Sequence, residues 1–546
     1  MTIFHSSYPS LPVPDQPYHK MLISAIERQI HTPGANKVAF IHAEDSKNVI
    51  TYEKLLNTSK AVGTYLHSIG FEKNIACAVV ANVWQYPAFF LGVAMNGGAV
   101  SGASALFTDY ELERQFKDSK CMVVLTSADQ LAKVEKAAKG CTDIRAIIVI
   151  GGTGNGSNTV SWDSVASTPI RTIPEPKIDI YNDLVILPYS SGTTGPPKGV
   201  MLSHFNLACM MELHAYTDIQ KNAKVLDENW DYEREKILLF LPFYHAFGFG
   251  LLNFSLLRGS CGIIFKHFEP PLFLKNIQEH KIRMIALVPP ILVFLAKHPA
   301  CDKFDLSSME AIICGAAPAG REICEEAQKR YPKLRLIRQG YGMTECTMAS
   351  HVPDFSLEQP FGCVGKLLPN LMMKIIDTDT GKELGVGERG EICVKGPTVM
   401  LGYFCRDEAT KNTLRDGWLH TGDIGYADKD GNVFIVDRLK ELIKVKGYQV
   451  PPAELEDLLL THPGILDAAV IGIPDRDVGE KVKAYVVKKD NALIEADVIK
   501  FVESKVSPYK RLTAGVEFIK EIPKSAAGKI LRRFLRDQAA QATSKI

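Results

Sequence analysis

Short apolar runs alternate with segments of helical periodicity up to about residue 370. The segment 51–69 places Leu55 and Val62 at near-helical spacing and stops at a glycine, which is typical of an amphipathic helix. Helical patterns recur at Leu131–Ala138 and Arg321–Arg330. Runs that indicate short buried strands lie at 75–81, 121–126, 146–150, 184–188, 237–241, 261–265, 284–288 and 311–314. This alternation predicts an α/β fold, with a mostly parallel sheet and helices on its faces.

The pattern changes after about residue 370. Strand-like segments follow one another across turns such as Asp430-Gly431-Asn432, without a helical pattern between them, at 371–377, 391–395 and 433–436. Consecutive strands joined by turns predict an antiparallel or barrel-like subdomain.

Helical and strand patterns mix again beyond Asp437. Pro451–Glu454 has the proline and the acid that are typical of a first helical turn. Strands are indicated at 468–473 and 484–488, and helices near 496–506 and 529–537. We therefore expect two domains, residues 1–437 and 438–546, with a hinge near 437–440.

Composition changes this picture little. The 546 residues suffice for two or more domains, and 46% hydrophobic and 23% charged residues are ordinary for a globular protein. Lys and Arg total 63 against 62 for Asp and Glu, so no global charge favours nucleic acid or an anionic membrane as a partner.

The twelve cysteines contain no C-x-x-C pair and no Cys/His cluster at zinc spacing. This argues for reduced thiols in an intracellular compartment and against a disulfide framework or a structural zinc site. Most cysteines are expected to be small core or strand residues, such as Cys121 and Cys393.

Targeting signals are indicated only at one end. The first twenty residues lack a basic region and an apolar core, and no run of about twenty apolar residues occurs, so we expect a soluble protein without a signal peptide or a transmembrane segment. The final Ser544-Lys545-Ile546 resembles the peroxisomal S-K-L signal. It predicts peroxisomal import through a receptor, with a cytoplasmic location as the alternative.

The stretch Tyr189–His204, YSSGTTGPPKGVMLSH, is the most informative part of the chain. Hydroxyls, glycines and one lysine follow a predicted strand, and together they suit a polyphosphate. It is not a Walker A loop, because Pro197 and Gly199 stand where that motif needs glycine and Ser/Thr. The predicted phosphate-binding residues are Ser190, Ser191, Gly192, Thr193, Thr194, Gly195 and Lys198.

A hydroxyl stands beside a carboxylate in the segment Gln339–Glu345, QGYGMTE. Thr344 and Glu345 offer the oxygen ligands that a magnesium ion bridging phosphates needs. From these residues alone, an ordinary turn with a solvated glutamate is the preferred interpretation.

Three further stretches carry possible chemistry. Asp423, in a predicted turn, either caps its own backbone or binds both ribose hydroxyls with Arg438 as a second contact. His245, among aromatic residues, is either a packed core histidine or a site residue. The lysines of 437–450 either lie on a solvated face or face a cleft between domains, whereas Lys529, at the end of IPKSAAGK, indicates nothing by itself.

Together these stretches resemble the adenylate-forming superfamily of acyl-CoA synthetases, 4-coumarate–CoA ligases and beetle luciferases. The resemblance covers roughly residues 40 to 535, with every main motif in order. It implies a large N-terminal domain of two α/β subdomains and a small β-barrel, capped by a small mobile α+β C-terminal domain. ATP, Mg²⁺ and coenzyme A are the implied cofactors, and a small carboxylic acid is the implied substrate.

The resemblance also implies roles for residues. Lys529 would be the adenylation lysine, and Thr344 and Glu345 would serve phosphate and magnesium. His245 would lie beside the acyl-adenylate, and Lys444 would be catalytic. The remaining implied contacts are Gly315, Ala316, Ala317, Gln339, Gly340, Tyr341 and Gly342 for the adenine and acyl pockets, Asp423 and Arg438 for ribose, Lys440 for the hinge, and Lys446, Gly447 and Gln449 for the CoA channel.

The implied reaction is the activation of a hydrophobic carboxylic acid, a fatty or an aryl acid, to acyl-AMP and then to acyl-CoA. His267 departs from the Lys or Arg common in relatives, and Met348 and Ala246 depart from firefly luciferase. Three alternatives remain: a luciferase-like oxygenase, an adenylating enzyme that loads a carrier protein, and a non-catalytic nucleotide-binding module.

Overall fold

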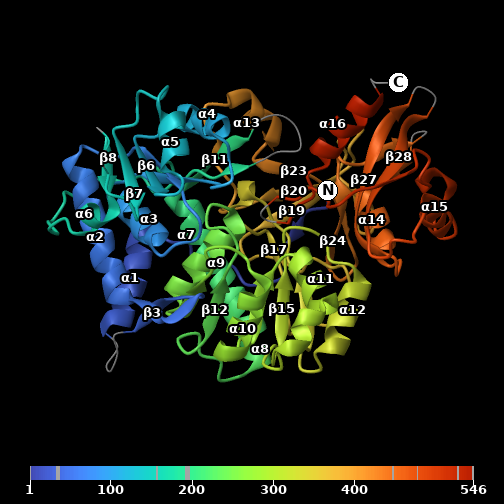
Figure 1. Cartoon of the computed structure of the whole chain (residues 1–546), viewed down its shortest axis with the longest axis horizontal. Helices are drawn as coiled ribbons and strands as arrows, with labels where there is room; N and C mark the ends of the chain where they lie inside the picture. The colour runs from blue at the N-terminus through green and yellow to red at the C-terminus, as the bar shows by residue number, and fades with distance from the viewer. Residues whose placement is uncertain are drawn as a thin grey trace.

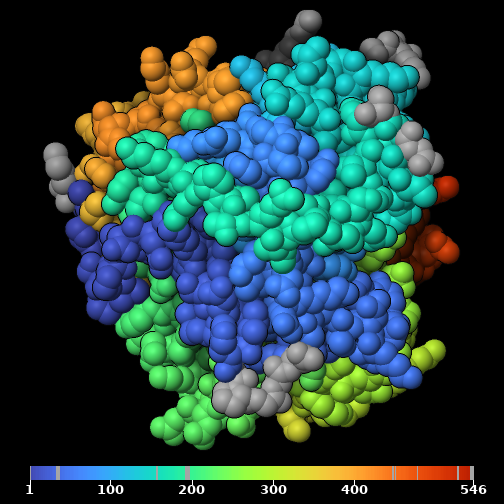
Figure 2. Space-filling view, turned by 90° about the vertical axis from the view of Figure 1, so that its left-hand side faces the viewer, coloured from blue at the N-terminus to red at the C-terminus, as the bar shows by residue number. Residues whose placement is uncertain are grey.

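The computed structural model describes residues 2–31, 37–154, 156, 158–190, 197–445, 448–475, 478–525 and 528–543. In Figure 1 the labelled elements from α1 to β8 lie on the left of the molecule, and those between β12 and α12 lie at its lower centre. The segment from α14 to α16 forms a smaller body on the right. Figure 2 views the molecule from the left of Figure 1, and red C-terminal residues show only at its edge. This is the expected α/β architecture, with a large N-terminal and a small C-terminal part.

The first α/β unit is a nine-stranded sheet whose main path runs β10-β11-β9-β5-β4-β6-β7-β8. From β9 onward neighbouring strands are parallel. The parallel strands are β4 (Ile75–Val79), β5 (Ala99–Ala103), β6 (Val123–Ser127), β7 (Ala146–Ile150), β8 (Thr159–Ser161) and β9 (Leu184–Ile186).

Alternate residues of β4 face two different cores. Ala76 and Ala78 join the large core that also holds residues of α2 (Tyr52–Ser68) and α3 (Gln85–Met95). Cys77 and Val79 join the core under α4 (Asp109–Ser119) and α5 (Leu131–Ala138). A strand buried on both faces must be apolar throughout, which is why the sequence pattern there is a continuous run rather than an alternation.

The second α/β unit contains two smaller sheets that share one hydrophobic core. One has the order β12-β13-β2-β3, and the other is the parallel sheet β14-β15-β16. The strands are β2 (Val38–His42), β3 (Asp45–Thr51), β12 (Lys236–Leu239), β13 (Cys261–Ile264), β14 (Met284–Leu287), β15 (Ala311–Cys314) and β16 (Leu336–Gln339). The helices are α9 (Ala246–Leu257), α10 (Pro270–His280), α11 (Pro289–Lys297) and α12 (Arg321–Arg330).

The predicted antiparallel subdomain is a six-stranded sheet, with the path β1-β19-β20-β23-β22 and β24 paired to β23. Its strands are β1 (Phe4–His5), β19 (Met372–Ile376), β20 (Gly390–Lys395), β22 (Leu414–Arg415), β23 (Trp418–Ala427) and β24 (Val433–Arg438).

The C-terminal body is a five-stranded sheet with helices. Its strands are β25 (Ile443–Val445), β26 (Tyr448–Val450), β27 (Ile465–Asp475), β28 (Gly479–Lys488) and β29 (Val516–Phe518). Its helices are α14 (Pro452–Leu460), α15 (Glu495–Glu503) and α16 (Arg532–Thr543). Separate apolar clusters lie within this body, which indicates that it has its own core.

The prediction that no helix interrupts the antiparallel region was wrong. Helix α13 (Asp407–Thr413) lies between two of its strands and has no buried residue. A helix without an apolar face leaves no hydrophobic periodicity to recognise.

Three local predictions also need correction. Residues 198–203 form the strand β11, antiparallel to β10 (Tyr189–Ser190). The stretch Tyr189–His204 therefore contains two paired strands and is not a loop throughout. Asp423 lies within β23 rather than in a turn. Helix α16 begins at Arg532, because an antiparallel bridge between Lys524 and Ile530 first folds the chain into a tight turn that contains Lys529.

Within the described ranges, no helix has the length and apolar character that crossing a membrane requires. All twelve cysteines have free thiols, and most are buried, as the sequence predicted.

Candidate active site

The carboxyl ends of β14, β15 and β16 meet at one edge of their sheet, where Leu287, Cys314 and Gln339 are neighbours in register. Ligands bind preferentially at such edges of α/β sheets. The Gln339 side chain accepts a hydrogen bond from the Ala319 N–H (2.9 Å) and donates one to the Ala319 carbonyl (3.3 Å). Gln339 therefore holds the segment after β15, in which Ala316 has a left-handed φ of 70°. Whether Gln339 also contacts a ligand stays a prediction.

Glu345 is a buried carboxylate, 5% exposed, in the short 3₁₀ helix Thr344–Cys346. The Ser190 hydroxyl donates to Glu345 Oε1 (2.8 Å), and the Tyr403 hydroxyl donates to the same oxygen (2.9 Å). Oε2 takes part in neither bond. A carboxylate oxygen and the neighbouring Thr344 hydroxyl are hard donors, so this pair fits a Mg²⁺ ion.

Lys198 lies on the other side of Tyr403. Its Nζ is 4.8 Å from the centre of the Tyr403 ring, close enough for a cation–π contact. Tyr403 thus contacts both the Lys198 ammonium and the buried carboxylate of Glu345. Ser191, Gly192, Thr193, Thr194 and Gly195 lie outside the described residues.

Asp423, Arg438 and Tyr341 form a second charged group. The Tyr341 hydroxyl donates to Asp423 Oδ2 (2.6 Å), and Arg438 Nε lies 3.1 Å from Asp423 Oδ1. Asp423 and Arg438 are partners in register on β23 and β24. Burial, together with the negative charge of Asp423, raises the pKa of Tyr341 well above its usual range, so its hydroxyl remains a donor.

The backbone around Asp423 is distorted because β23 carries extra residues. Glu391 pairs with Ile424, and Cys393 pairs with His420. An advance of two residues along β20 is therefore matched by four residues along β23. The extra residues form a bulge that contains Gly422, with a φ of 70°. This bulge presents Asp423 at the site.

Lys529 reaches this group from the C-terminal body. Burial and then the Arg438 charge lower its pKa to about 8, while Asp423 and Glu441 act in the opposite direction. The preceding Gly528 lies against the start of α11: an added Cβ would be 3.1 Å from Pro290 and 3.3 Å from Val288. The structure therefore brings Lys529 to the carboxyl edge of β14–β16.

His245 caps α9, accepting a hydrogen bond at Nδ1 from the Phe247 N–H (3.4 Å). Burial and then the nearby Lys529 lower its pKa to about 4, so its imidazole is neutral at pH 7. Phe247 packs over Gly315, where an added Cβ would lie 3.1 Å from its ring, and Met348 fills the space beside Gly250. His245 thus precedes the apolar side chain of Phe247 in sequence and lies near Lys529 of the charged group.

Other predicted site residues lie elsewhere or outside the description. Gly340 and Gly342 flank Tyr341 at the edge described above. Lys440 and Lys444 are exposed, and Lys444 points outward from β25 between two buried neighbours. Lys446 and Gly447, and the side chain of Gln449, lie outside the described part of the chain, so their predicted CoA contacts stay predictions.

Sequence reasoning missed two residues that hold this site together. Tyr403 contacts both Lys198 and Glu345, yet nothing in its neighbourhood LGYF indicates chemistry. Glu391 accepts a hydrogen bond at Oε1 from the Gly422 N–H (2.9 Å) and so supports the bulge. An alternating strand pattern around residue 391 indicates its face, but not this contact.

Comparisons with known proteins agree with this geometry. The AMP-binding enzyme family model matches residues 26–404, and the model of the AMP-binding enzyme C-terminal domain matches residues 454–529. A probable 4-coumarate–CoA ligase of Dictyostelium discoideum is 35% identical over 98% of both chains. The peroxisomal OPC-8:0-CoA ligase 1 of Arabidopsis thaliana is 36% identical, covering 97% of this chain and 95% of its own.

The fold likewise has a close counterpart among solved structures. An anthranilate CoA ligase in complex with anthranoyl-AMP superposes with a TM-score of 0.85 at 25% identity, covering 97% of this chain and 99% of its own. The chain therefore belongs to the AMP-binding enzyme family, in the adenylate-forming branch that contains acyl-CoA synthetases, 4-coumarate–CoA ligases and beetle luciferases.

Proposed function

We propose that this protein is an AMP-forming acid–CoA ligase that activates a hydrophobic carboxylic acid with ATP and transfers the acyl group to coenzyme A. The observation that carries the proposal is the position of Lys529. It comes from the C-terminal body, yet its charge acts on His245 and Arg438 of the main body.

In the first half-reaction a carboxylate oxygen attacks the α-phosphorus of ATP and pyrophosphate leaves. Lys529 neutralises charge on the α-phosphate and orients the carboxylate, and Lys198 with Ser190 binds the other phosphates. Asp423 accepts hydrogen bonds from the ribose hydroxyls, with Arg438 beside it. The protein thus acts by positioning and by charge stabilisation.

Magnesium fits the donor set of Thr344 and Glu345, and when bound it supplies charge neutralisation for the phosphates. Ser190 and Tyr403 hold Glu345 Oε1 in place, and Oε2 takes part in neither of these bonds. Their part is to orient the carboxylate before any ligand arrives.

In the second half-reaction the C-terminal body rotates about Lys440 and removes Lys529 from the site. Contacts on the two sides of Lys440 support this hinge: the Leu439 N–H bonds to the Gly422 carbonyl, whereas Glu441 pairs with Arg536 of α16 (2.6 Å). Rotation would break the bond from the Ala453 N–H to Asp437 Oδ2 (3.1 Å) and the packing of Gly528 on Pro290. A pantetheine thiol then attacks the mixed anhydride, and acyl-CoA and AMP are released.

The substrate is an apolar acid. Phe247 and Met348 supply the apolar wall near His245, and a neutral imidazole adds no charge there. Relatives named for 4-coumarate, OPC-8:0 and anthranilate are consistent with an aryl or a fatty acid. A peroxisomal location belongs to the same proposal, supported by the peroxisomal relative.

The test is pyrophosphate release by the purified full-length protein with Mg²⁺ and ATP, across a panel of fatty and aryl acids, with and without CoA. We expect acid-dependent AMP formation and a thioester only when CoA is present. No AMP from any acid would contradict the proposal, and AMP without thioester would contradict its second half.

A further inference from the structure

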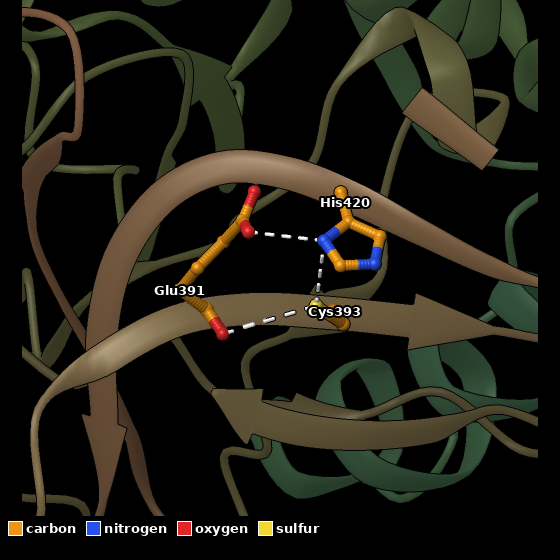
Figure 3. Close-up of side chains that lie close together, drawn as sticks. All are labelled: Glu391, Cys393 and His420. Carbon is orange, nitrogen blue, oxygen red and sulfur yellow. Dashed lines mark hydrogen bonds and ion pairs between the residues drawn. The ribbon is translucent and has the colours of Figure 1, made fainter. Parts of the chain in front are cut away.

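Glu391, Cys393 and His420 converge on one face of the sheet behind the Asp423 bulge (Figure 3). Glu391 and Cys393 are two residues apart on β20, so their side chains share a face. His420 lies opposite Cys393 on β23 and turns its Nδ1 toward both. None of these side chains acts directly in the reaction steps above, although Glu391 supports the bulge through the Gly422 N–H.

The donor atoms lie near the spacing that they would have around a tetrahedral metal ion, without matching it. His420 Nδ1 is 3.0 Å from Glu391 Oε2 and 3.5 Å from Cys393 Sγ. The ligand atoms of the three residues all lie within 4.8 Å of one another. Zinc bonds of about 2.0–2.3 Å at tetrahedral angles separate neighbouring donors by about 3.3–3.6 Å. Small side-chain rotations therefore suffice to ligate an ion.

The chemistry of the donors selects the kind of ion. One thiolate, one imidazole and one carboxylate form a borderline-soft set that suits Zn²⁺ rather than Mg²⁺. The 2+ charge of the ion is balanced by the single negative charges of the carboxylate and the thiolate. The ion can therefore occupy this poorly exposed position without an unpaired charge. Lys374 and Arg415 lie near Cys393 and would oppose any site of net positive charge.

We propose that Glu391, Cys393 and His420 form a Zn²⁺ site with a fourth position open to water. Binding releases the Cys393 thiol proton to solvent, and the imidazole proton of His420 resides on Nε2, so that the Nδ1 lone pair, which now faces Glu391 and Cys393, binds the ion.

The site has one consequence for the nucleotide, and this consequence rests on the proposed function. Glu391 Oε2 faces the ion, while Oε1 accepts the hydrogen bond from Gly422 in the ribose bulge. An ion on Oε2 withdraws charge from the carboxylate and weakens that bond. Zinc should therefore raise the Kd for ATP several-fold, and the KM with it, and ATP should raise the Kd for zinc by the same factor as zinc raises the Kd for ATP.

The test uses metal-free full-length protein titrated with Zn²⁺ alone against a chromophoric chelator. We expect one equivalent to bind, and Cys393→Ser and His420→Gln each to lower the affinity by at least about 100-fold, as expected for losing a direct ligand rather than a supporting contact. Cys405→Ser removes an exposed thiol outside the cluster and should leave the affinity unchanged.

A second readout starts from the wild-type protein, so its first result does not depend on how well a variant folds. Co²⁺ bound to the wild-type protein should give a thiolate-to-cobalt charge-transfer band in the near ultraviolet, retained in Cys405→Ser and lost in Cys393→Ser. Absence of this band, or unchanged zinc affinity in folded Cys393→Ser, would overturn the site. A zinc-dependent rise in KM that persists in Cys393→Ser would overturn the coupling to ATP.

Discussion

The two halves of the candidate site are built in different ways. Glu345, Ser190 and Tyr403 belong to the main body and are joined by short hydrogen bonds. Lys529 enters from the C-terminal body, and Gly528 beside it packs on Pro290. The first half exists whatever position the C-terminal body takes, whereas the second exists only in the arrangement seen here. A permanent phosphate site and a removable charge are what two successive reactions at one carboxyl group need.

The largest effect should come from Lys529→Ala. Losing a charged transition-state contact should lower acyl-adenylate formation by about 10² or more, while thioester formation from supplied acyl-adenylate largely survives. Single-turnover assays of each half-reaction measure this. Lys524→Ala is the matched control, because Lys524 pairs with Asp467 within the C-terminal body (2.6 Å). If Lys529→Ala lowered the rates of both half-reactions equally, the distinction between the two halves of the site would be wrong.

The pH profile should follow the Lys529 ammonium. Because the pKa of Lys529 is lowered to about 8, the charged form prevails below that pH and is lost above it. The kcat/KM of adenylation should be level at lower pH and fall about tenfold between pH 7 and pH 9. Lys529→Arg keeps its charge and should show no such fall. Identical profiles for the two proteins would show that another group titrates.

A smaller effect on the rate is expected from a change at Tyr403, in the half of the site that belongs to the main body. Tyr403→Phe removes one of two hydrogen bonds to Glu345 and keeps the ring beside Lys198, so adenylation should fall about 3- to 10-fold. Tyr189→Phe is the control, since that hydroxyl donates to Asp118 instead (2.8 Å). Initial rates of pyrophosphate release suffice. Equal rates in the two variants would mean that the Tyr403 hydroxyl does not support Glu345.

Much of the fold follows from apolar patterns. The runs 146–150 and 311–314 predicted β7 and β15 at their observed bounds, because strands buried on both faces must be apolar. Helix α13 escaped because no residue of it is buried. The position of Asp423 escaped because a bulge depends on the register between two strands, which no local pattern records.

The site was less accessible to sequence reasoning than the fold. The motif around Ser190 indicated phosphate, but its bond to Glu345 joins residues 155 positions apart. Cys393 is the buried strand residue that the sequence predicted, but its approach to Glu391 and His420 depends on pairing across two strands, which a search for zinc spacing along the chain cannot detect. The role of Lys529 came from the family resemblance alone, since its partners lie in the other body.

Locking the two bodies together tests the central claim most directly. Asp457 of α14 faces Gly320 at the start of α12, where an added Cβ would lie 3.6 Å from Asp457 Oδ1. The same added Cβ would lie 3.8 Å from Asp457 Cγ, the position that the sulfur takes in Asp457→Cys, so Gly320→Cys with Asp457→Cys brings two thiols close enough for oxidation to a disulfide. The oxidised double variant should form acyl-AMP and pyrophosphate but no acyl-CoA, and reduction should restore the thioester. The single variants, treated alike, should make acyl-CoA throughout. If the locked protein makes acyl-CoA as fast as the reduced one, the C-terminal body does not need to move, and the account is wrong.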